Sequence, residues 1–186
     1  ITGQETLSIA EDMPLTLKPT DLKVTDPDNS YPNDFTITIN DGTNYSVSDL
    51  IITPDKNFNG DLSVQVFVND GTANSAVYNL KVTVTAVNDG PVITGQESLD
   101  TEKNTPLLIS LSDLKVLDPD NNYPDGFRLN IQQGSNYTVT GNLINPAPDF
   151  TGTLTVNVTV NDGTANSEPF PLQIVVSSPS NTPPEI

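Results

Sequence analysis

An internal repeat constrains the fold of this chain more than any other feature of its sequence. Shifted by 92 residues, the sequence aligns with itself without a gap, and 42 of the 92 aligned pairs are identical. The matching segments include 1–5 with 93–97, 26–29 with 118–121, and 68–75 with 160–167. A duplication of this kind predicts two copies of one fold, residues 1–92 and 93–186. Because 183–186 resemble 90–93, we expect a third copy to begin there.

Each copy contains segments in which apolar and polar residues alternate. The clearest are 62–68 and 80–85, with their counterparts 154–160 and 172–176. Alternation with a period of two is typical of strands that have one buried face. Shorter strands, separated by Asp-Gly, Pro and Asn turns, are expected at 15–17, 35–39 and 45–47. About seven strands in each copy indicate an all-β chain of immunoglobulin-like Greek-key sandwiches.

The valines of the alternating segments are the expected core. Alternation places every second side chain on one face, and a slip of one residue would expose the whole apolar set. We expect one core in each copy. The predicted core valines are Val64, Val66, Val68, Val82 and Val84, and in the second copy Val156, Val158 and Val160.

The charge composition limits the classes of partner. The chain has 24 acidic and 7 basic residues and a formal net charge of −17. Nucleic acid and anionic lipid require clustered Lys and Arg, so neither is an expected partner. The sequence has no apolar run of about 18 residues, and we expect no direct membrane insertion. The acidity either serves solubility or gathers cations.

The chain contains no Cys and no His. Thiolate chemistry, disulfides, a Ser-His-Asp arrangement and the usual zinc sites are therefore excluded, and any metal must be bound by oxygen. Pairs of carboxylates cleave glycosides in some enzymes, but that chemistry needs a cleft and one raised pKa. We expect no enzymatic activity.

One acidic cluster lies in a predicted loop after a strand of the second copy. Asp118 and Asp120 flank a proline, and the first copy has Asp26 and Asp28 at the same positions. Calcium prefers about six to eight oxygen ligands, and such a loop supplies several. The alternative is an Asx-type turn that ends at Asn121.

A second cluster is centred on Asp162, in an Asn-Asp-Gly turn whose counterpart contains Asp70. In such a turn the Gly supplies a positive φ. Another turn, Asp41-Gly42, becomes Gln133-Gly134 in the second copy, which indicates that this turn requires only its Gly. Since the acid is kept at 70 and 162, these two positions indicate a role beyond the turn.

Asn88 and Asp89 form a third cluster between the copies. The segment around them is expected to be short and extended, because Pro91 fixes its own φ and restricts Gly90. It contains no Lys or Arg. Acidic loops gathered near it would repel one another unless a cation lay among them.

These segments resemble a known family. Residues 82–92, Val-Thr-Val-Thr-Ala-Val-Asn-Asp-Gly-Pro-Val, are similar to the boundary motif of cadherin repeats, where a terminal strand leads into Asp-x-Asn-Asp-Asn-x-Pro. The Asp-x-Asp at 118–120 and the strand ending in Asp at 66–70 resemble the same family. The likeness is closest to the bacterial cadherin-like repeats, including the dystroglycan-type branch, of large surface adhesins and secreted proteins. It implies two tandem immunoglobulin/cadherin-like Greek-key β-sandwiches.

The resemblance also implies calcium as the cofactor. Position by position, the ligands at the boundary would be Glu11, Asp55 and Asn57 of the first copy, Asn88 and Asp89 of the linker, and Asp118, Asp120 and Asp162 of the second copy. The ligands of an incomplete half-site would be Asp26, Asp28 and Asp70. Ala86 and Gly90 replace an Asp and an Asn of the linker motif, and Asn57 replaces a Glu, which implies fewer or weaker ions.

The base of the second copy departs further from the family pattern. Lys103 aligns with Glu11, and Ala147 aligns with Asp55. Glu102 and Asp149 are the residues that would compensate.

The function that the resemblance implies is that of an extracellular or cell-surface spacer and adhesion segment, stiffened by calcium. Its expected partners are neighbouring repeats of the same chain and a cell-surface protein or polysaccharide. Association between identical arrays is left open. The alternative is a carbohydrate-binding module, in which Tyr31 or Tyr123 would stack on a sugar; Tyr45 and Tyr137 are weaker candidates, and core packing is the competing role for all four.

Overall fold

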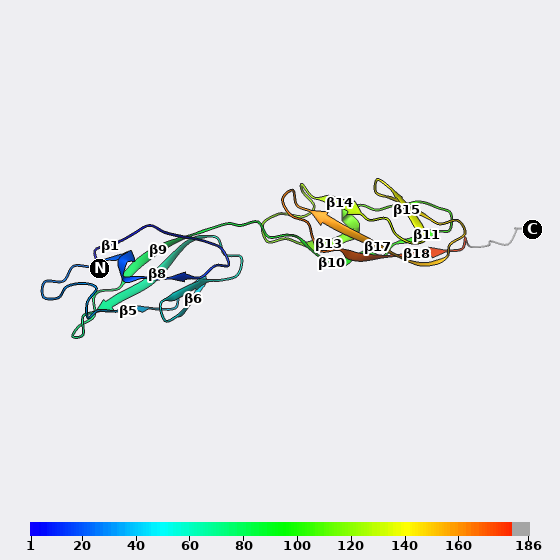
Figure 1. Ribbon diagram of the computed structural model, residues 1–186. Coiled ribbons are helices and arrows are strands. Elements are labelled where there is room, and N and C mark those ends of the chain that lie inside the picture. The colour runs from blue at the N-terminus through cyan, green and yellow to red at the C-terminus, as the bar shows by residue number, and fades with distance from the viewer. Residues whose placement is uncertain (180–186) are drawn as a thin grey trace, which may run out of the picture. The chain divides into compact units, whose positions relative to one another are not determined.

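The computed structural model describes residues 1–179. The chain divides into two compact units, Ile1–Val87 and Asn88–Ile186. The colours of Figure 1 change from blue through green in the first unit and from green to red in the second. The 92-residue period of the sequence predicts a boundary between the copies after residue 92. This exact division of the chain stays a prediction. The expected start of a third copy at 183–186 lies outside the described residues.

The first unit contains two main sheets, each built from strands that are distant in sequence. One has the order β2 (Leu7–Ala10), β9 (Tyr78–Thr85), β8 (Gly60–Asn69) and β5 (Thr36–Ile39), with only the β2–β9 pair parallel. The other is the antiparallel sheet β3 (Leu15–Thr16), β7 (Ile51–Pro54) and β6 (Tyr45–Ser48). A short pair joins β1 (Gly3–Gln4) to β4 (Leu22–Lys23), after the single 3₁₀ turn Pro19–Asp21.

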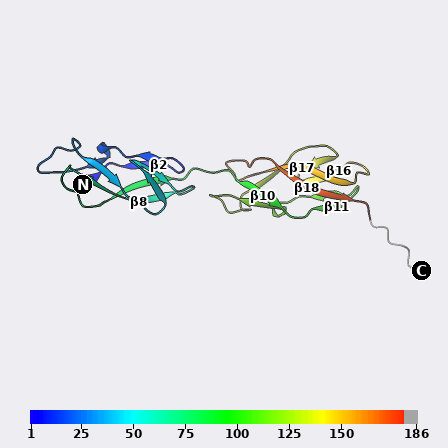
Figure 2. The ribbon, with the colours of Figure 1, turned by 90° about the horizontal axis from the view of Figure 1, so that it is seen from below.

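The second unit repeats this topology. Its four-stranded sheet has the order β11 (Asp100–Glu102), β18 (Phe170–Ser177), β17 (Gly152–Asn161) and β14 (Arg128–Ile131). Its three-stranded sheet is β12 (Leu107–Leu108), β16 (Leu143–Pro146) and β15 (Tyr137–Thr140). The strand β10 (Val92–Gln96) pairs with β13 (Leu114–Leu117), which directly follows the 3₁₀ turn Leu111–Asp113. In Figure 2, β17 and β18 lie side by side as antiparallel neighbours. The predicted all-β fold is confirmed.

Each unit has its own hydrophobic core, as predicted. All eight predicted core valines are at most 3% exposed. They belong to two separate clusters of buried side chains, one in each unit. In the described part of the chain, no helix has the length and apolarity needed to cross a membrane.

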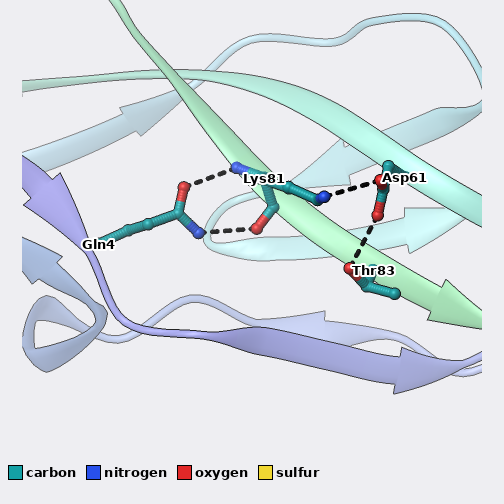
Figure 3. A network of polar contacts seen from close by, with 4 residues as sticks. All are labelled: Gln4, Asp61, Lys81 and Thr83. Atoms are coloured by element: carbon teal, nitrogen blue, oxygen red, sulfur yellow. Dashed lines mark hydrogen bonds and ion pairs between the residues drawn. The ribbon is translucent and has the colours of Figure 1, made fainter.

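A glutamine side chain makes hydrogen bonds to backbone groups at the point where the chain passes from one sheet to another. The chain leaves β1, which pairs with β4, and continues into β2, which pairs with β9. At this crossing the Gln4 side chain takes the place of a strand: its amide nitrogen donates to Lys81 O, and its amide oxygen accepts from Lys81 N, both at 2.7 Å (Figure 3). Gln96 makes the same pair of bonds to Gln173, at 2.8 and 2.7 Å. The repeated Thr-Gly-Gln-Glu segment is thus explained by edge pairing.

We expect Gln4→Ala to destabilise the first unit by about 1–3 kcal/mol, because two backbone hydrogen bonds are lost together. Thermal unfolding of the full chain, with Gln96→Ala as the parallel variant in the second unit, measures the effect. Gln65→Ala is the matched control, since Gln65 is exposed on β8 and its side chain makes no hydrogen bond within the described residues. Equal unfolding temperatures for Gln4→Ala and Gln65→Ala would show that the bridge contributes nothing.

The turn before β6 requires more than its glycine, which corrects the sequence analysis. A Cβ on Gly42 would lie 2.4 Å from the Tyr45 hydroxyl oxygen, so a side chain there would collide with the buried ring. The preceding residue also has a role, because Asp41 Oδ1 accepts from Val47 N at 2.9 Å. Gln133 Oε1 replaces this acceptor in the second unit, at 3.1 Å from Val139 N. Asp and Gln are interchangeable here because both provide a carbonyl-type oxygen.

Candidate functional site

The loop after β13 is held by one aspartate. Asp118 Oδ1 accepts from the backbone N–H groups of Asp120 and Asn121, at 2.9 and 2.8 Å. This is the Asx-type turn that the sequence suggested as the alternative. The other carboxylate oxygen, Asp118 Oδ2, is buried and has no hydrogen-bond partner. A turn alone does not explain that atom, because a buried polar group without a partner costs about 1–3 kcal/mol.

The segment Asn88-Asp89 packs onto this loop within the second unit. The backbone N–H of Asp89 donates to Asp120 Oδ2 at 2.7 Å. The Asn121 side-chain amide donates to Asn88 Oδ1 at 3.4 Å and to Asp118 Oδ1 at 3.3 Å. The segment that the sequence placed between the copies is therefore a structural part of the acidic loop of the second unit.

Asp162 completes the cluster from the loop between β17 and β18. Its Oδ2 accepts from the Asn88 side-chain amide at 2.9 Å. Its Oδ1 accepts from the backbone N–H groups of Thr164 and Ala165, at 2.6 and 2.7 Å. Five predicted ligands are thus linked by direct contacts in one place. They are Asn88, Asp89, Asp118, Asp120 and Asp162; we call this group the acidic cluster.

Asn121 is a member of this site that was not predicted from the sequence. It was interpreted only as the end of a turn, yet its amide connects Asn88 to Asp118. The available signal was the identical residue Asn29 in the first copy.

Hydrogen bonds set the ionisation of Asp162. Partial burial alone would raise the pKa of this carboxyl group. The hydrogen bond from Asn88 and those from the backbone of Ala165 and Thr164 outweigh burial and hold the pKa of Asp162 below its usual value. The group is therefore a stable carboxylate at neutral pH.

We expect Asn88→Ala to raise the pKa of Asp162 in calcium-free buffer, because the variant removes the largest of the favourable contacts. Carboxyl NMR titration of the full chain measures it. Asp70 is the internal control: its loop has the same sequence, its pKa is lowered chiefly by backbone bonds from Ala73 and Thr72, and Asn88→Ala should leave that pKa unchanged. An unchanged pKa of Asp162 in the variant would show that Asn88 does not stabilise the carboxylate.

Three aspartates of the cluster, Asp118, Asp120 and Asp162, have no ion pair with a Lys or Arg in the part of the chain that the structure describes. In the same part of the chain, no group of three or more His, Cys, Asp or Glu side chains is arranged to hold a metal ion as it stands. Amide and backbone oxygens would have to complete any coordination shell.

The first unit has the corresponding loops. Asp26 Oδ1 accepts from Asp28 N and Asn29 N, at 2.9 and 2.8 Å. Asn29 donates to Asp70 Oδ2 at 3.4 Å, so the two loops are connected as in the second unit. The expected half-site at Asp26, Asp28 and Asp70 stays a prediction.

The remaining predicted ligands lie at the base of the first unit, by which we mean residues 11–12 and 55–57. Glu11 is only 5% exposed, and its Oε1 accepts from Val87 N at 2.5 Å. Asn57 N donates to Asp12 Oδ1 at 2.9 Å, while Asn57 Oδ1 is buried without a hydrogen-bond partner. Asp55 is exposed, and its side chain makes no hydrogen bond within the described residues. Asp12, which the sequence analysis did not single out, is the direct neighbour of Asn57.

The two tyrosines considered for sugar stacking are used for packing. Tyr31 and Tyr123 contact Phe35 and Phe127 edge to face, with ring centroids 5.3 and 5.1 Å apart. The hydroxyl of Tyr31 donates to Pro19 O at 2.8 Å, and that of Tyr123 donates to Leu111 O. Burial, followed by the charge of Asp113, raises the pKa of Tyr123. Both rings are packed against the cores, and Tyr45 and Tyr137 are fully buried.

Comparison with known proteins agrees with this architecture. Residues 88–175 match a family model described as "Bacterial Ig domain", and this segment contains the whole acidic cluster. Human protocadherin-24 EC1-2 is similar in structure, with a TM-score of 0.59 and 14% identity over 95% of this chain and 96% of that one. Drosophila N-cadherin EC1-4 matches with a TM-score of 0.50 and 14% identity, over 94% of this chain and 49% of that one.

The chain thus spans about half the length of that N-cadherin fragment. A search of curated proteins finds no match. At these identities the structural likeness shows the fold, and it confirms the expected immunoglobulin/cadherin-like sandwiches.

Proposed function

We propose that this chain is a pair of bacterial cadherin-like, Ig-like repeats that forms a non-catalytic, calcium-binding segment of a larger surface or secreted protein. The support for the repeat family is the match of residues 88–175 to a bacterial Ig domain model and the cadherin-like fold. The repeat fold supports an adhesion-type extracellular role. In the proposed role the repeats act as a spacer that carries an adhesive part of the protein, and calcium stiffens the chain where the two repeats join.

One observation carries the calcium part of the proposal, namely the buried Asp118 Oδ2 that has no hydrogen-bond partner. It lies in a group whose other acidic members include Asp120 and Asp162, and no Lys or Arg pairs with any of these three within the described residues. A hard cation would stabilise a carboxylate oxygen in this setting.

The acidic cluster fits calcium by its donor chemistry. Carboxylate oxygens of Asp89, Asp118, Asp120 and Asp162 and the amide oxygen of Asn88 are all hard ligands, and the chain offers no thiolate or imidazole that would favour zinc. Bound calcium would supply positive charge that offsets their mutual repulsion. Glu11, Asp55 and Asn57 are the ligands that we propose from the base of the first repeat.

The proposed partners are neighbouring repeats of the same chain and a cell-surface protein or polysaccharide, outside the cell. The carbohydrate-binding alternative loses its main argument, because Tyr31 and Tyr123 are engaged in packing and hydrogen bonds.

Calorimetric titration of the full chain with calcium, and in parallel with magnesium, tests the proposal. We expect calcium binding with a dissociation constant of about 10⁻⁴ to 10⁻³ M, typical of extracellular modules, and weaker binding of magnesium. At a tenfold excess over this constant, calcium should stabilise the fold by about 1.4 kcal/mol, which corresponds to several degrees in unfolding temperature. A calcium titration without binding heat, together with an unchanged unfolding temperature, would show that the acidic cluster serves only turn formation and solubility.

A further inference from the structure

We infer that the base of the second repeat carries its own cation, the Lys103 ammonium, and does not bind calcium. The base of the second repeat means residues 103–104 and 147–149, which align with 11–12 and 55–57 of the first. The inference rests on the proposed function, because it contrasts this end of the second repeat with the calcium ligands of the first.

The two bases differ in charge at every ligand position. The first has carboxylates at Glu11, Asp12 and Asp55, with Lys56 beside them. In the second, the aligned residues are Lys103, Asn104, Ala147 and Pro148, and the one carboxylate is Asp149 in place of Asn57. Three carboxylates are therefore reduced to one, and an ammonium replaces the buried Glu11.

The local backbone geometry is nevertheless the same in both bases. Glu11 N donates to Thr85 O at 2.9 Å, and Lys103 N donates to Ser177 O at 2.8 Å. Asn57 N donates to Asp12 Oδ1, and Asp149 N donates to Asn104 Oδ1, both at 2.9 Å. We call this hydrogen bond between the two segments of a base the clamp. Its acceptor is the Asp12 carboxylate in the first repeat and the Asn104 amide in the second, so the clamp is kept while the carboxylate moves to the other segment.

The exchange changes which oxygen needs a cation. In the first repeat, Asn57 Oδ1 is buried without a hydrogen-bond partner. In the second, Asp149 Oδ1 lies 3.5 Å from Lys103 Nζ and accepts from the Asn104 side-chain amide at 3.3 Å. The oxygen that corresponds to the unsatisfied one is therefore already neutralised and hydrogen-bonded.

A divalent ion does not fit beside this pair. It would have to displace Lys103, whose side chain is 34% exposed, or bind next to its positive charge. Among residues 1–179, only Asp149 and the neighbouring Glu102 remain as anionic ligands at this end, far short of the oxygen set that calcium requires. The Lys103–Asp149 pair is partly exposed, so we expect it to neutralise charge rather than to contribute much stability.

Residue-resolved NMR of the full chain during a calcium titration tests the inference. In the wild type, the amide signals of Glu11, Asp12 and Asn57 and those of the acidic cluster should shift. The signals of Lys103, Asn104 and Asp149 should stay in place over the same range. A quadruple variant, Lys103→Glu with Asn104→Asp, Ala147→Asp and Asp149→Asn, should acquire calcium-dependent shifts at these positions.

The control variant is Lys115→Glu, which repeats the Lys-to-Glu substitution at an exposed ion pair with Glu97 elsewhere in the second repeat. It should leave the signals of 103–104 and 149 insensitive to calcium. Wild-type shifts at Lys103, Asn104 and Asp149 would overturn the inference and leave the proposed function standing. So would a folded quadruple variant that stays silent while the acidic cluster responds. A wild type in which no signal shifts would overturn both, since the contrast between the ends would not exist.

Discussion

Val158→Asp is expected to unfold the second repeat and to leave the first repeat folded. Val158 is fully buried on β17. An unpaired buried charge costs about 3–5 kcal/mol, and the lost burial of a valine adds about 1.5–3 kcal/mol. Together these approach the whole stability of a small domain, about 5–15 kcal/mol. The first repeat should be unaffected because its core cluster shares no residue with that of the second.

NMR of the full chain distinguishes the outcomes. The variant should show random-coil signals for the second repeat and unchanged, dispersed signals for Ile1–Val87. Asn157→Asp is the matched control: it adds the same charge one position earlier on β17, on the exposed face, and should leave both repeats folded. Loss of both repeats in Val158→Asp would show that the two cores fold as a single unit.

The cores could be predicted from the sequence because alternation within a short segment determines which side chains face the core. Once 62–68 and 154–160 are strands, their valines can share only one face. The repeat then provided an internal check, because the same apolar positions recur after 92 residues. The Greek-key sandwich class followed from the number and spacing of the predicted strands rather than from any single residue.

The finer contacts could not be predicted in this way. The Gln4 bridge depends on where the chain passes from β1, which pairs with β4, to β2, which pairs with β9. Nothing near Gln4 in the sequence encodes the position of Lys81. The clamp between Asp12 and Asn57 joins residues that are 45 positions apart. Such partners are set by loop conformation, in which positive φ at Asp12 and Asn57 orients the polar groups.

Asp118 shows both what could be predicted from the sequence and what could not. The sequence offered a turn and a calcium ligand as alternatives; the structure shows the turn at one carboxylate oxygen, and the calcium ligand stays a proposal for the other. Oδ1 forms the turn, and Oδ2 is buried without a hydrogen-bond partner. An aspartate is therefore needed only for Oδ2, because an asparagine would provide the same Oδ1 acceptor.

Asp118→Asn is accordingly expected to have opposite effects without and with calcium. Without calcium, the variant should be more stable than the wild type by about 1 kcal/mol, because it removes a buried negative charge and offers an amide donor to the neighbouring carboxylates. With calcium, it should lose at least about tenfold in affinity, since the site loses an anionic ligand. The calcium-dependent rise in unfolding temperature should disappear.

Thermal unfolding in chelator and in millimolar calcium measures both effects on one pair of proteins. The matched control is Asp26→Asn, at the same position of the first repeat, where Oδ1 makes the same two backbone bonds. Asp26→Asn should keep the calcium-dependent rise, because the complete set of ligands is untouched. If Asp118→Asn kept that rise in full, Oδ2 would not be a calcium ligand. If it lowered the stability in chelator instead of raising it, the buried oxygen would have a stabilising contact within the protein, and the argument for a cation at this position would fail.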